Sequence, residues 1–453
     1  MLRGLRGFLW ECRYGLLIGV LAPLAVWGLG QVHWNGSHGT HARATRTGPP
    51  VPARSFLERL IPSPSGTLRG VRASSDIRRL VARLPVERRV AQLLLVGFDG
   101  RDSSAPFLGT LRRMDLGGVA IQSQNYTGTS QLASLTKAIA GAASGRGHEP
   151  LLIVAPQEGG QFSAFPDLPP TAAAGDLSTP ADAAAEARAS ARALKRLGLN
   201  GVLGPDIDVG ASGPDPLGVR AFSSDPRDVT AYASATVSAY RGARMLAAPG
   251  HFPGIGAAAQ STDQQPTSVG LGIGDLEKRD LRPFRAAIGA GAPAVVLGHA
   301  AYQPDNFVVP GSLSHAIATN LLRGVLGYRG VAITDDLEAG AITSQMTVPD
   351  AAVRAIVAGA DMVYISGPEA DWQAAYRALV AAVRKGTISQ LRLNTAVTRI
   401  VTIKRELGLR NRRGAGLGGR SATGAAQGPT GAAGRAQPTP AQSSTRRGGA
   451  PGR

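Results

Sequence analysis

Short apolar runs alternate with longer amphipathic segments along the central part of the chain. The apolar runs fall at residues 90–98, 117–124, 151–156, 201–209, 247–252, 294–300, 330–336 and 361–366. Segments with the helical spacing of apolar residues separate most of them: TSQLASLTKAIAGAA, PADAAAEARASARALKRLG, DVTAYASATVSAYRGARML, SHAIATNLLRGVLG and DWQAAYRALVAAVRKG. Buried strands that alternate with helices form parallel sheets. The pattern therefore predicts an α/β fold, a single (β/α)8 TIM-type barrel over residues 78–409.

A long apolar run near the start of the chain has no such alternation. Residues 15–32 (GLLIGVLAPLAVWGLGQV) carry no charge, and Arg3, Arg6 and Arg13 precede them. This length is near the minimum that spans a bilayer, and flanking arginines stay on the cytoplasmic side. We expect residues 1–14 to be a basic cytoplasmic segment and residues 15–32 a signal anchor in the cell membrane, with the barrel on the extracytoplasmic side. The alternative is a signal peptide cleaved near the ARA at 42–44, which would secrete the barrel.

The segments that flank the barrel have a different composition. Residues 33–77 are rich in Gly, Pro, Ser, Thr and Arg, which predicts a flexible linker. Residues 410–453 are rich in Arg, Gly and Ala and lack hydrophobic periodicity, which predicts a disordered tail.

The net charge of +18 comes mainly from the two ends of the chain. Residues 1–72 carry nine arginines against Glu11 and Glu58, and residues 411–453 carry seven arginines and no acid. Polybasic tails attract anionic surfaces in general, but this tail has no aromatic residue on which bases could stack. We therefore expect no nucleic-acid partner, and we expect a monomer. Cys12 is the only cysteine, which excludes an internal disulfide.

The residues that follow the apolar runs carry the functional signal, because strand ends form the active-site rim of a TIM barrel. They read QLLLVGF (92–98), QEGG (157–160), RAFSSDP (220–226), HFPGIG (251–256), ITDDLEAG (333–340) and AGADMVYIS (358–366). In this order they resemble the family 3 glycoside hydrolases, and most of all the bacterial β-N-acetylhexosaminidases that act on cell-wall amino sugars. The resemblance covers roughly residues 78–409. It implies hydrolysis of O-glycosyl bonds in a cell-wall or other glycan, without a metal or cofactor.

A retaining glycosidase needs a carboxylate nucleophile and, about 5 Å away, a group that donates and then accepts a proton. The resemblance assigns the nucleophile to Asp335, the acid directly after Thr334, and leaves Asp336 to support the loop. It also matches Glu158, Arg220 and His251 to positions that hold the substrate. The alternative is that these three residues are structural, with Arg220 as an ion-pair partner at the rim and His251 as a packed imidazole. Asp208 and His299 match further positions and are expected to brace strand ends.

The loop that should carry the acid/base departs from the family pattern. That pattern is K-H-F-P-G-H-G followed after four residues by D-S-H, whose Asp–His pair moves the proton. Residues 250–266 read GHFPGIGAAAQSTDQQP, so Gly250 replaces the lysine and Ile255 the second histidine. Counted without a gap, Ser261 takes the place of the aspartate and Asp263 that of its histidine partner. Asp263 is therefore the candidate acid/base, with a pKa raised by burial or by the nearby nucleophile. The alternative is an ordinary solvated loop aspartate.

Three further positions lack groups that the family uses to bind sugar. Pro156 stands where the family has an aspartate, and Gln161 and Ala164 stand where it has arginines. A hydrogen bond to a charged group contributes roughly 1.5–3 kcal/mol, and loss of general acid/base catalysis costs about 10²–10⁴ in rate. The sequence therefore predicts a glycosidase with impaired or altered activity. The alternative is an inactive pseudo-glycosidase that binds peptidoglycan or another glycan.

Overall fold

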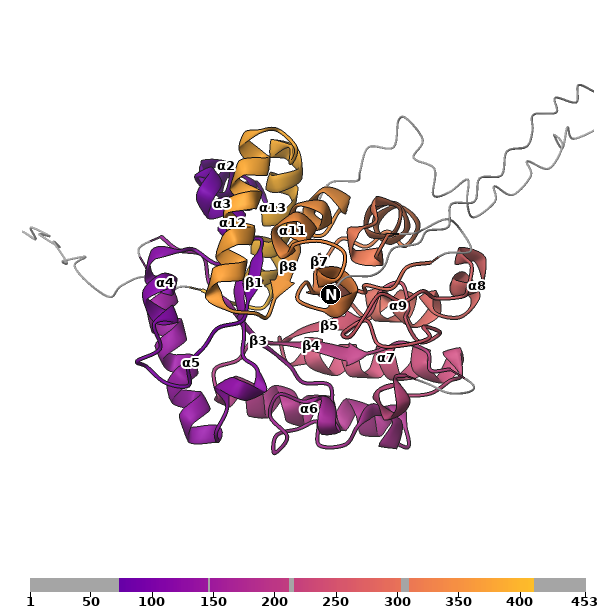
Figure 1. The fold of residues 1–453 in the computed structure, drawn as a ribbon. Helices are drawn as coiled ribbons and strands as arrows, with labels where there is room; N and C mark the ends of the chain where they lie inside the picture. Colours follow the sequence, from indigo (N-terminus) through magenta and orange to yellow (C-terminus); the bar gives the residue numbers. More distant parts are fainter. Residues whose placement is uncertain (1–72, 146, 212–215, 303–308, 411–453) are drawn as a thin grey trace, which may run out of the picture. The chain divides into compact units, whose positions relative to one another are not determined.

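The computed structural model describes residues 73–145, 147–211, 216–302 and 309–410 (Figure 1). Each apolar run singled out in the sequence coincides with one strand of this structure, and the fifth strand begins one residue before its run. The strands are β1 (Leu94–Val96), β2 (Gly118–Ala120), β3 (Leu152–Pro156), β4 (Gly201–Asp206), β5 (Leu246–Gly250), β6 (Ala294–Leu297), β7 (Val331–Asp336) and β8 (Met362–Ile365).

The strands form one sheet in the order β5-β4-β3-β2-β1-β8-β7-β6, and all paired strands are parallel. The two ends of this order approach each other just after β5. There the N–H of Phe252 donates to the carbonyl of Val296 at 2.8 Å, and the N–H of Gly298 donates to the carbonyl of Phe252 at 2.9 Å. The sheet is therefore a nearly closed barrel, as the predicted (β/α)8 fold requires.

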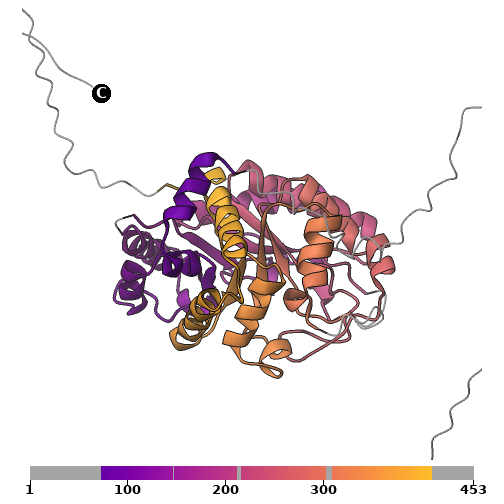
Figure 2. The ribbon, with the colours of Figure 1, turned by 90° about the horizontal axis from the view of Figure 1, so that it is seen from above.

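Helices surround the strands, as the view from above shows (Figure 2). Four of the five expected helical segments contain α-helices, and the fifth contains the π-helix η7. Side chains of Thr179, Asp225 and Ser389 cap the helices that begin at Pro180, Pro226 and Gln390 by accepting a backbone N–H. The helices are α2 (Ser75–Arg83), α3 (Val86–Ala91), α4 (Phe107–Arg113), α5 (Thr129–Ala143), α6 (Pro180–Arg196), α7 (Pro226–Gly242), α8 (Ile273–Lys278), α9 (Leu281–Gly289), η7 (Ala316–Val325), α10 (Gly340–Thr343), α11 (Val348–Ala358), α12 (Glu369–Arg384) and α13 (Gln390–Glu406).

The strands form the core of the barrel, and they become exposed at one end only. Every residue of β1, β2, β4, β5, β6 and β8 is buried. Strands β3 and β7 are buried until their last residues, Pro156 and Asp335–Asp336, which are partly exposed. Because parallel strands end on the same side of the barrel, this rim is where side chains can meet a ligand.

Several predictions from the sequence concern other parts of the chain. The expected signal anchor at 15–32, the linker as far as residue 72 and the tail from residue 411 lie outside the described residues. Within the described ranges, no helix combines the length and apolarity that a membrane span needs. Helix α2 begins at Ser75, inside the segment assigned to the linker, where the hydroxyl of Ser74 accepts the N–H of Ile77 at 3.3 Å.

Candidate active site

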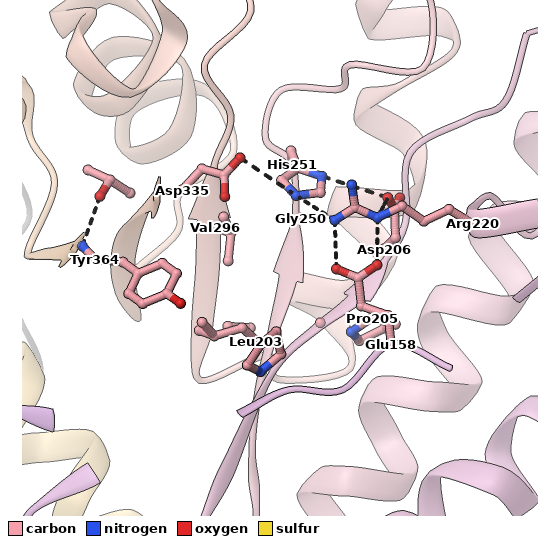
Figure 3. Close-up of a pocket in the computed structure, with 14 residues that line it drawn as sticks. Glu158, Leu203, Pro205, Asp206, Arg220, Gly250, His251, Val296, Asp335 and Tyr364 are labelled. Carbon is pink, nitrogen blue, oxygen red and sulfur yellow. Dashed lines mark hydrogen bonds and ion pairs between the residues drawn. The ribbon is translucent and has the colours of Figure 1, made fainter. Parts of the chain in front are cut away.

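Asp335, the predicted nucleophile, lies at the end of β7 and lines a cavity of about 90 Å³ (Figure 3). Its carboxylate accepts the N–H of Asp336 at 2.9 Å, and its Oδ2 lies 3.9 Å from Nε2 of His251. Burial favours the neutral form, but the neighbouring His251 and His299 outweigh it and hold the pKa of Asp335 below its usual value. Asp335 is therefore an ionised carboxylate at the cavity, the state that a nucleophile requires.

His251 follows β5 directly, and its side chain is fixed by Asp208. The backbone N–H and the Nδ1 of His251 lie 3.0 and 2.8 Å from Oδ2 of Asp208, so Nε2 faces Asp335. Burial would lower the pKa of His251, but the charge of Asp335 and the hydrogen bond to Asp208 raise it to about 10. At neutral pH the ring is therefore an imidazolium between two carboxylates.

Arg220 and Glu158 form a bidentate ion pair beside His251. Nε and Nη2 of Arg220 donate to the two carboxylate oxygens of Glu158 at 2.6 and 2.7 Å. Nη2 also lies 3.3 Å from Nε2 of His251. Figure 3 shows His251 and Arg220 between Asp335 and Glu158, joined by these contacts. The fold thus brings four of the five predicted site residues into one cluster.

Asp206, the last residue of β4, belongs to this cluster and was missed in the sequence. Its Oδ1 accepts the N–H of Asp208 at 2.8 Å, and its Oδ2 lies 3.2 Å from Nε of Arg220. Burial and the charge of Asp208 raise the pKa of Asp206 well above its usual value, which favours the protonated form. The signal lay in GPDIDV (204–209), because two acids at alternate positions after a strand point to the same side.

Asp206, Asp208 and His251 could each offer one ligand atom to a metal ion, since these atoms lie within 4.8 Å of one another. In the structure they bond to one another and to Arg220 instead. These contacts hold the His251 ring in place.

Asp336 and His299 support the loop after β7. The Asp336 carboxylate accepts the N–H groups of Glu338 and Ser366 at 3.1 and 3.0 Å. His299 lies 2.8 Å from the carbonyl of Asp336 and 2.8 Å from the hydroxyl of Ser312. These bonds fix the backbone that presents Asp335.

Asp263, the candidate acid/base, lies on the loop after β5 and is exposed. It lines an adjoining cavity of about 260 Å³ that shares Pro156, Glu158 and Arg220 with the first. The carbonyl of Asp263 accepts the N–H of Gly340 at 2.8 Å, which ties the loop to the start of α10. Asp263 is not among the residues that line the cavity of Asp335. Asp263 therefore faces the adjoining cavity, and its role stays a prediction.

The ends of β3 and β5 bring no hydrogen-bonding side chain to the cavity. Pro156 and Gly250 occupy these positions. A Cβ added at Gly250 would lie 3.0 Å from Cβ of Val296, closer than ordinary packing allows. Val296 thus occupies the space that a side chain at position 250 would need. Of the other two substituted positions, Gln161 is exposed and Ala164 is buried.

Known proteins are similar to this chain in sequence and in fold. The sequence profile of the glycosyl hydrolase family 3 N-terminal domain matches residues 85–403. The chain belongs to glycoside hydrolase family 3. A β-hexosaminidase of Xanthomonas oryzae pv. oryzae is 34% identical to it over 287 residues, which cover 61% of this chain and 84% of that protein.

Two solved structures have a similar fold. A family 3 β-N-acetylglucosaminidase from a Paenibacillus species matches with a TM-score of 0.69 and 30% identity, over 75% of this chain and 65% of its own. This chain therefore spans slightly less than two thirds of the Paenibacillus protein. A β-N-acetylhexosaminidase from Beutenbergia cavernae matches with a TM-score of 0.65 and 29% identity, over 72% of this chain and 99% of its own. The predicted resemblance to family 3 is confirmed.

Proposed function

We propose that this family 3 protein is a retaining, β-N-acetylhexosaminidase-type hydrolase of O-glycosyl bonds in a cell-wall or other glycan, with activity altered from that of its relatives. The observation that carries the proposal is the ionised carboxylate of Asp335 at the cavity, 3.9 Å from the His251 ring. The relatives named above support the substrate class.

In the proposed reaction, a carboxylate oxygen of Asp335 attacks the anomeric carbon while the bond from that carbon to the leaving oxygen breaks. The leaving oxygen takes a proton from the acid, which we assign to Asp263. Water then attacks the glycosyl–enzyme ester, gives its proton back to the same base and releases Asp335, with net retention of configuration. Arg220 and His251 are the donors that we assign to sugar hydroxyls, and Glu158 holds Arg220 in place.

Hydrolysis of chromogenic aryl β-glycosides tests the nucleophile separately from the acid. An activated phenolate leaves with little proton assistance, so turnover needs only Asp335 and a sugar pocket. We expect turnover that disappears in Asp335→Ala and persists in a matched control at an exposed acid, Asp176→Ala. Equal turnover in Asp335→Ala would contradict the assignment.

The role of Asp263 is tested by comparing two leaving groups. Asp263→Asn should lose about 10²–10⁴ in rate on a natural glycan and little on an aryl glycoside, because only the sugar leaving group needs a proton. Equal rates on the natural glycan before and after substitution would remove Asp263 from the mechanism.

A second candidate function is a glycan-binding barrel without turnover. It is favoured by the position of Asp263, which lines the adjoining cavity and not that of Asp335. Saturable glycan binding by a folded protein that hydrolyses none of several aryl glycosides would support it.

We also propose that the barrel works outside the cytoplasm, held by residues 15–32 or released after cleavage of that segment. The support is the uncharged run behind three arginines. Protease accessibility in intact cells and detection in membrane fractions would test this; a barrel found only in the cytosolic fraction would contradict it.

A further inference from the structure

Strand β8 brings a hydrogen-bonding side chain to the cavity beside Asp335. Tyr364 lies on β8 (Met362–Ile365), lines this cavity and is 8% exposed. Figure 3 shows the Tyr364 ring pointing from its strand into the pocket, with the hydroxyl at the leading end. Pro156 and Gly250, at the ends of β3 and β5, offer no such group. A polar ligand in this cavity therefore has a possible partner on β8 that β3 and β5 do not supply.

The backbone of Tyr364 is bonded to the strand and loop that carry Asp335. Its N–H donates to Oγ1 of Thr334 at 3.0 Å, and its carbonyl accepts the N–H of Leu337 at 3.0 Å. In the sheet Tyr364 pairs with Asp336, the residue after Asp335. These contacts on both sides of Asp335 fix the position of the phenol relative to the carboxylate, as a binding site requires.

The Tyr364 hydroxyl accepts a hydrogen bond from Gln122 and keeps its own hydrogen free. Nε2 of Gln122 lies 3.3 Å from the carbonyl of Ser366 and 3.2 Å from the Tyr364 hydroxyl. A carbonyl only accepts, so the Gln122 atom that faces it is the amide nitrogen, which donates to the phenol oxygen as well. Oε1 of Gln122 accepts from Gln124 at 2.9 Å, which agrees with this orientation. Among the described residues, the hydrogen of the Tyr364 hydroxyl has no acceptor.

This hydroxyl also keeps its proton. Burial and the charges of Asp336 and Asp335 raise the pKa of Tyr364 well above its usual value of 10. Tyr364 is therefore a neutral phenol that can donate one hydrogen bond at any pH at which the protein is folded and active. Buried donors in proteins nearly always have an acceptor, and a donor that faces a cavity finds it in the molecule that fills the cavity.

We propose that Tyr364 is a substrate-binding residue, whose hydroxyl donates a hydrogen bond to a hydroxyl or an acetamido carbonyl of the sugar held beside Asp335. The inference deepens the proposed function and rests on it for the presence of a sugar in this cavity. The ring oxygen is a poor partner, because it shares the positive charge of the oxocarbenium-like transition state and a donor there would oppose the reaction. The groups attached to the ring are the acceptors that remain.

Tyr364→Phe tests the inference in the full chain, because it removes the hydroxyl and keeps the ring. For the 4-nitrophenyl β-glycoside that wild type hydrolyses fastest, we expect kcat/KM to fall about 5–20-fold, the range for loss of one neutral hydrogen bond. Tyr328→Phe is the matched control. Its hydroxyl lies 3.2 and 3.3 Å from the carbonyls of Ala292 and Val331 at the other end of the barrel, so its loss should lower the thermal unfolding midpoint and leave kcat/KM unchanged.

A set of deoxy sugars separates a contact with the substrate from a structural role. Wild type and Tyr364→Phe are compared on the same aryl glycoside and on its analogues that lack the substituent at C2, C3, C4 or C6. The loss caused by Tyr364→Phe should disappear for one analogue, which lacks the bonded group, and persist for the others. An equal loss on every analogue would overturn the inference, and so would unchanged kcat/KM on the parent sugar. Both results leave the proposed function intact.

Binding separates the two proposals when turnover is absent. Ligand-observed NMR with the methyl β-glycosides and their deoxy analogues then measures the same comparison between wild type and Tyr364→Phe. Binding without hydrolysis that Tyr364→Phe weakens for all but one analogue supports the inference and contradicts the proposed function. Equal binding by both proteins, or no binding of any of these sugars, overturns the inference.

Discussion

At the amino end of the barrel, Asp361 directly precedes β8 and contacts three arginines. Its carboxylate lies 2.7 Å from Arg323, 2.9 Å from Arg399 and 3.3 Å from Arg392, and it also accepts the N–H of Ala332 at 3.1 Å. At the carboxyl rim, Asp335 has one backbone N–H at 2.9 Å and an imidazole nitrogen at 3.9 Å. Both carboxylates are ionised, and nearby cations lower the pKa of each against the effect of burial.

The two ends differ in what surrounds the charge. The Asp361 side chain is fully buried and its oxygens are occupied by protein donors, so it has nothing left to offer a ligand. The Asp335 side chain is 18% exposed and borders a cavity. A buried carboxylate whose oxygens all have partners supports the folded state only while those partners are kept. A carboxylate that has few partners and borders a cavity is available for chemistry. Removing the Asp335 carboxylate should therefore lower activity and leave stability nearly unchanged, whereas removing that of Asp361 should lower stability and leave activity nearly unchanged.

The largest expected effect is on activity, from Asp335→Asn. The amide cannot attack the anomeric carbon, and loss of a nucleophile typically lowers kcat by about 10⁴–10⁶. The free energy of unfolding should change by no more than about 1 kcal/mol, because the side chain has few protein partners. Aryl glycoside hydrolysis and urea unfolding measure the two quantities; a large loss of stability with retained turnover would reverse the comparison.

The next effect is on stability, from Asp361→Asn. The substitution leaves the buried Arg323 and Arg399 and the partly exposed Arg392 without their anion, and loss of a buried partner typically costs about 3–5 kcal/mol. Turnover at a temperature where the variant is still folded should match that of wild type. A variant as stable as wild type in urea would show that the three arginines do not depend on the charge of Asp361.

A smaller effect, on the pH dependence of stability, is expected from Lys404, which also lies near the amino end of the barrel. Its ammonium is fully buried against Oε1 of Gln92 at 2.7 Å, and burial lowers the pKa of Lys404 from 10.5 to about 8. Between these two values the unfolded chain binds more protons than the folded one, so this group makes stability rise with pH. Over that interval the gain is about 2–3 kcal/mol.

Lys404→Met should remove that pH-dependent gain, and exposed Lys385→Met should not. The measurement is the free energy of unfolding of the three proteins at pH 7.5 and pH 10. A difference between wild type and Lys404→Met that stays constant over this range would show that the Lys404 ammonium does not lose its proton there.

The smallest expected effect concerns the Asp208–His251 pair at the rim. Activity on aryl glycosides, which need little proton assistance, should fall as pH rises through the pKa of His251, about 10, because Asp335 and the sugar then lose the imidazolium. Asp208→Asn removes a charge that raises this pKa, so the basic limb of the kcat/KM profile should move down by about one unit or more. The acid limb belongs to Asp335, lies below its usual value of 3.8, and should stay in place. A basic limb that does not move would show that Asp208 does not raise the pKa of His251.

The sequence by itself determined the barrel and the position of Asp335 at the end of its seventh strand. Eight apolar runs separated by helical patterns specify the strands, because buried parallel strands need continuous apolar residues whatever their neighbours are. The helices that the pattern missed include α4, α8 and α10, which are too short to show a full helical period. Asp335, Arg220, His251 and Glu158 could be predicted because they match motifs of the resembling family. Three of them lie at or just after a strand end, and strand ends meet at one rim, whereas Arg220 ends η4 (Gly218–Arg220).

Only the tertiary structure decided which charges act on which. The rise in the pKa of His251 to about 10 depends on Asp208 and Asp335. Several helices and strands lie between these two residues in the sequence. The position of Asp263 in the adjoining cavity depends on the loop after β5, which a hydrogen bond ties to Gly340 at the start of α10. Electrostatic coupling and cavity shape are properties of distances between strands, and a linear pattern of apolar and polar residues does not contain those distances.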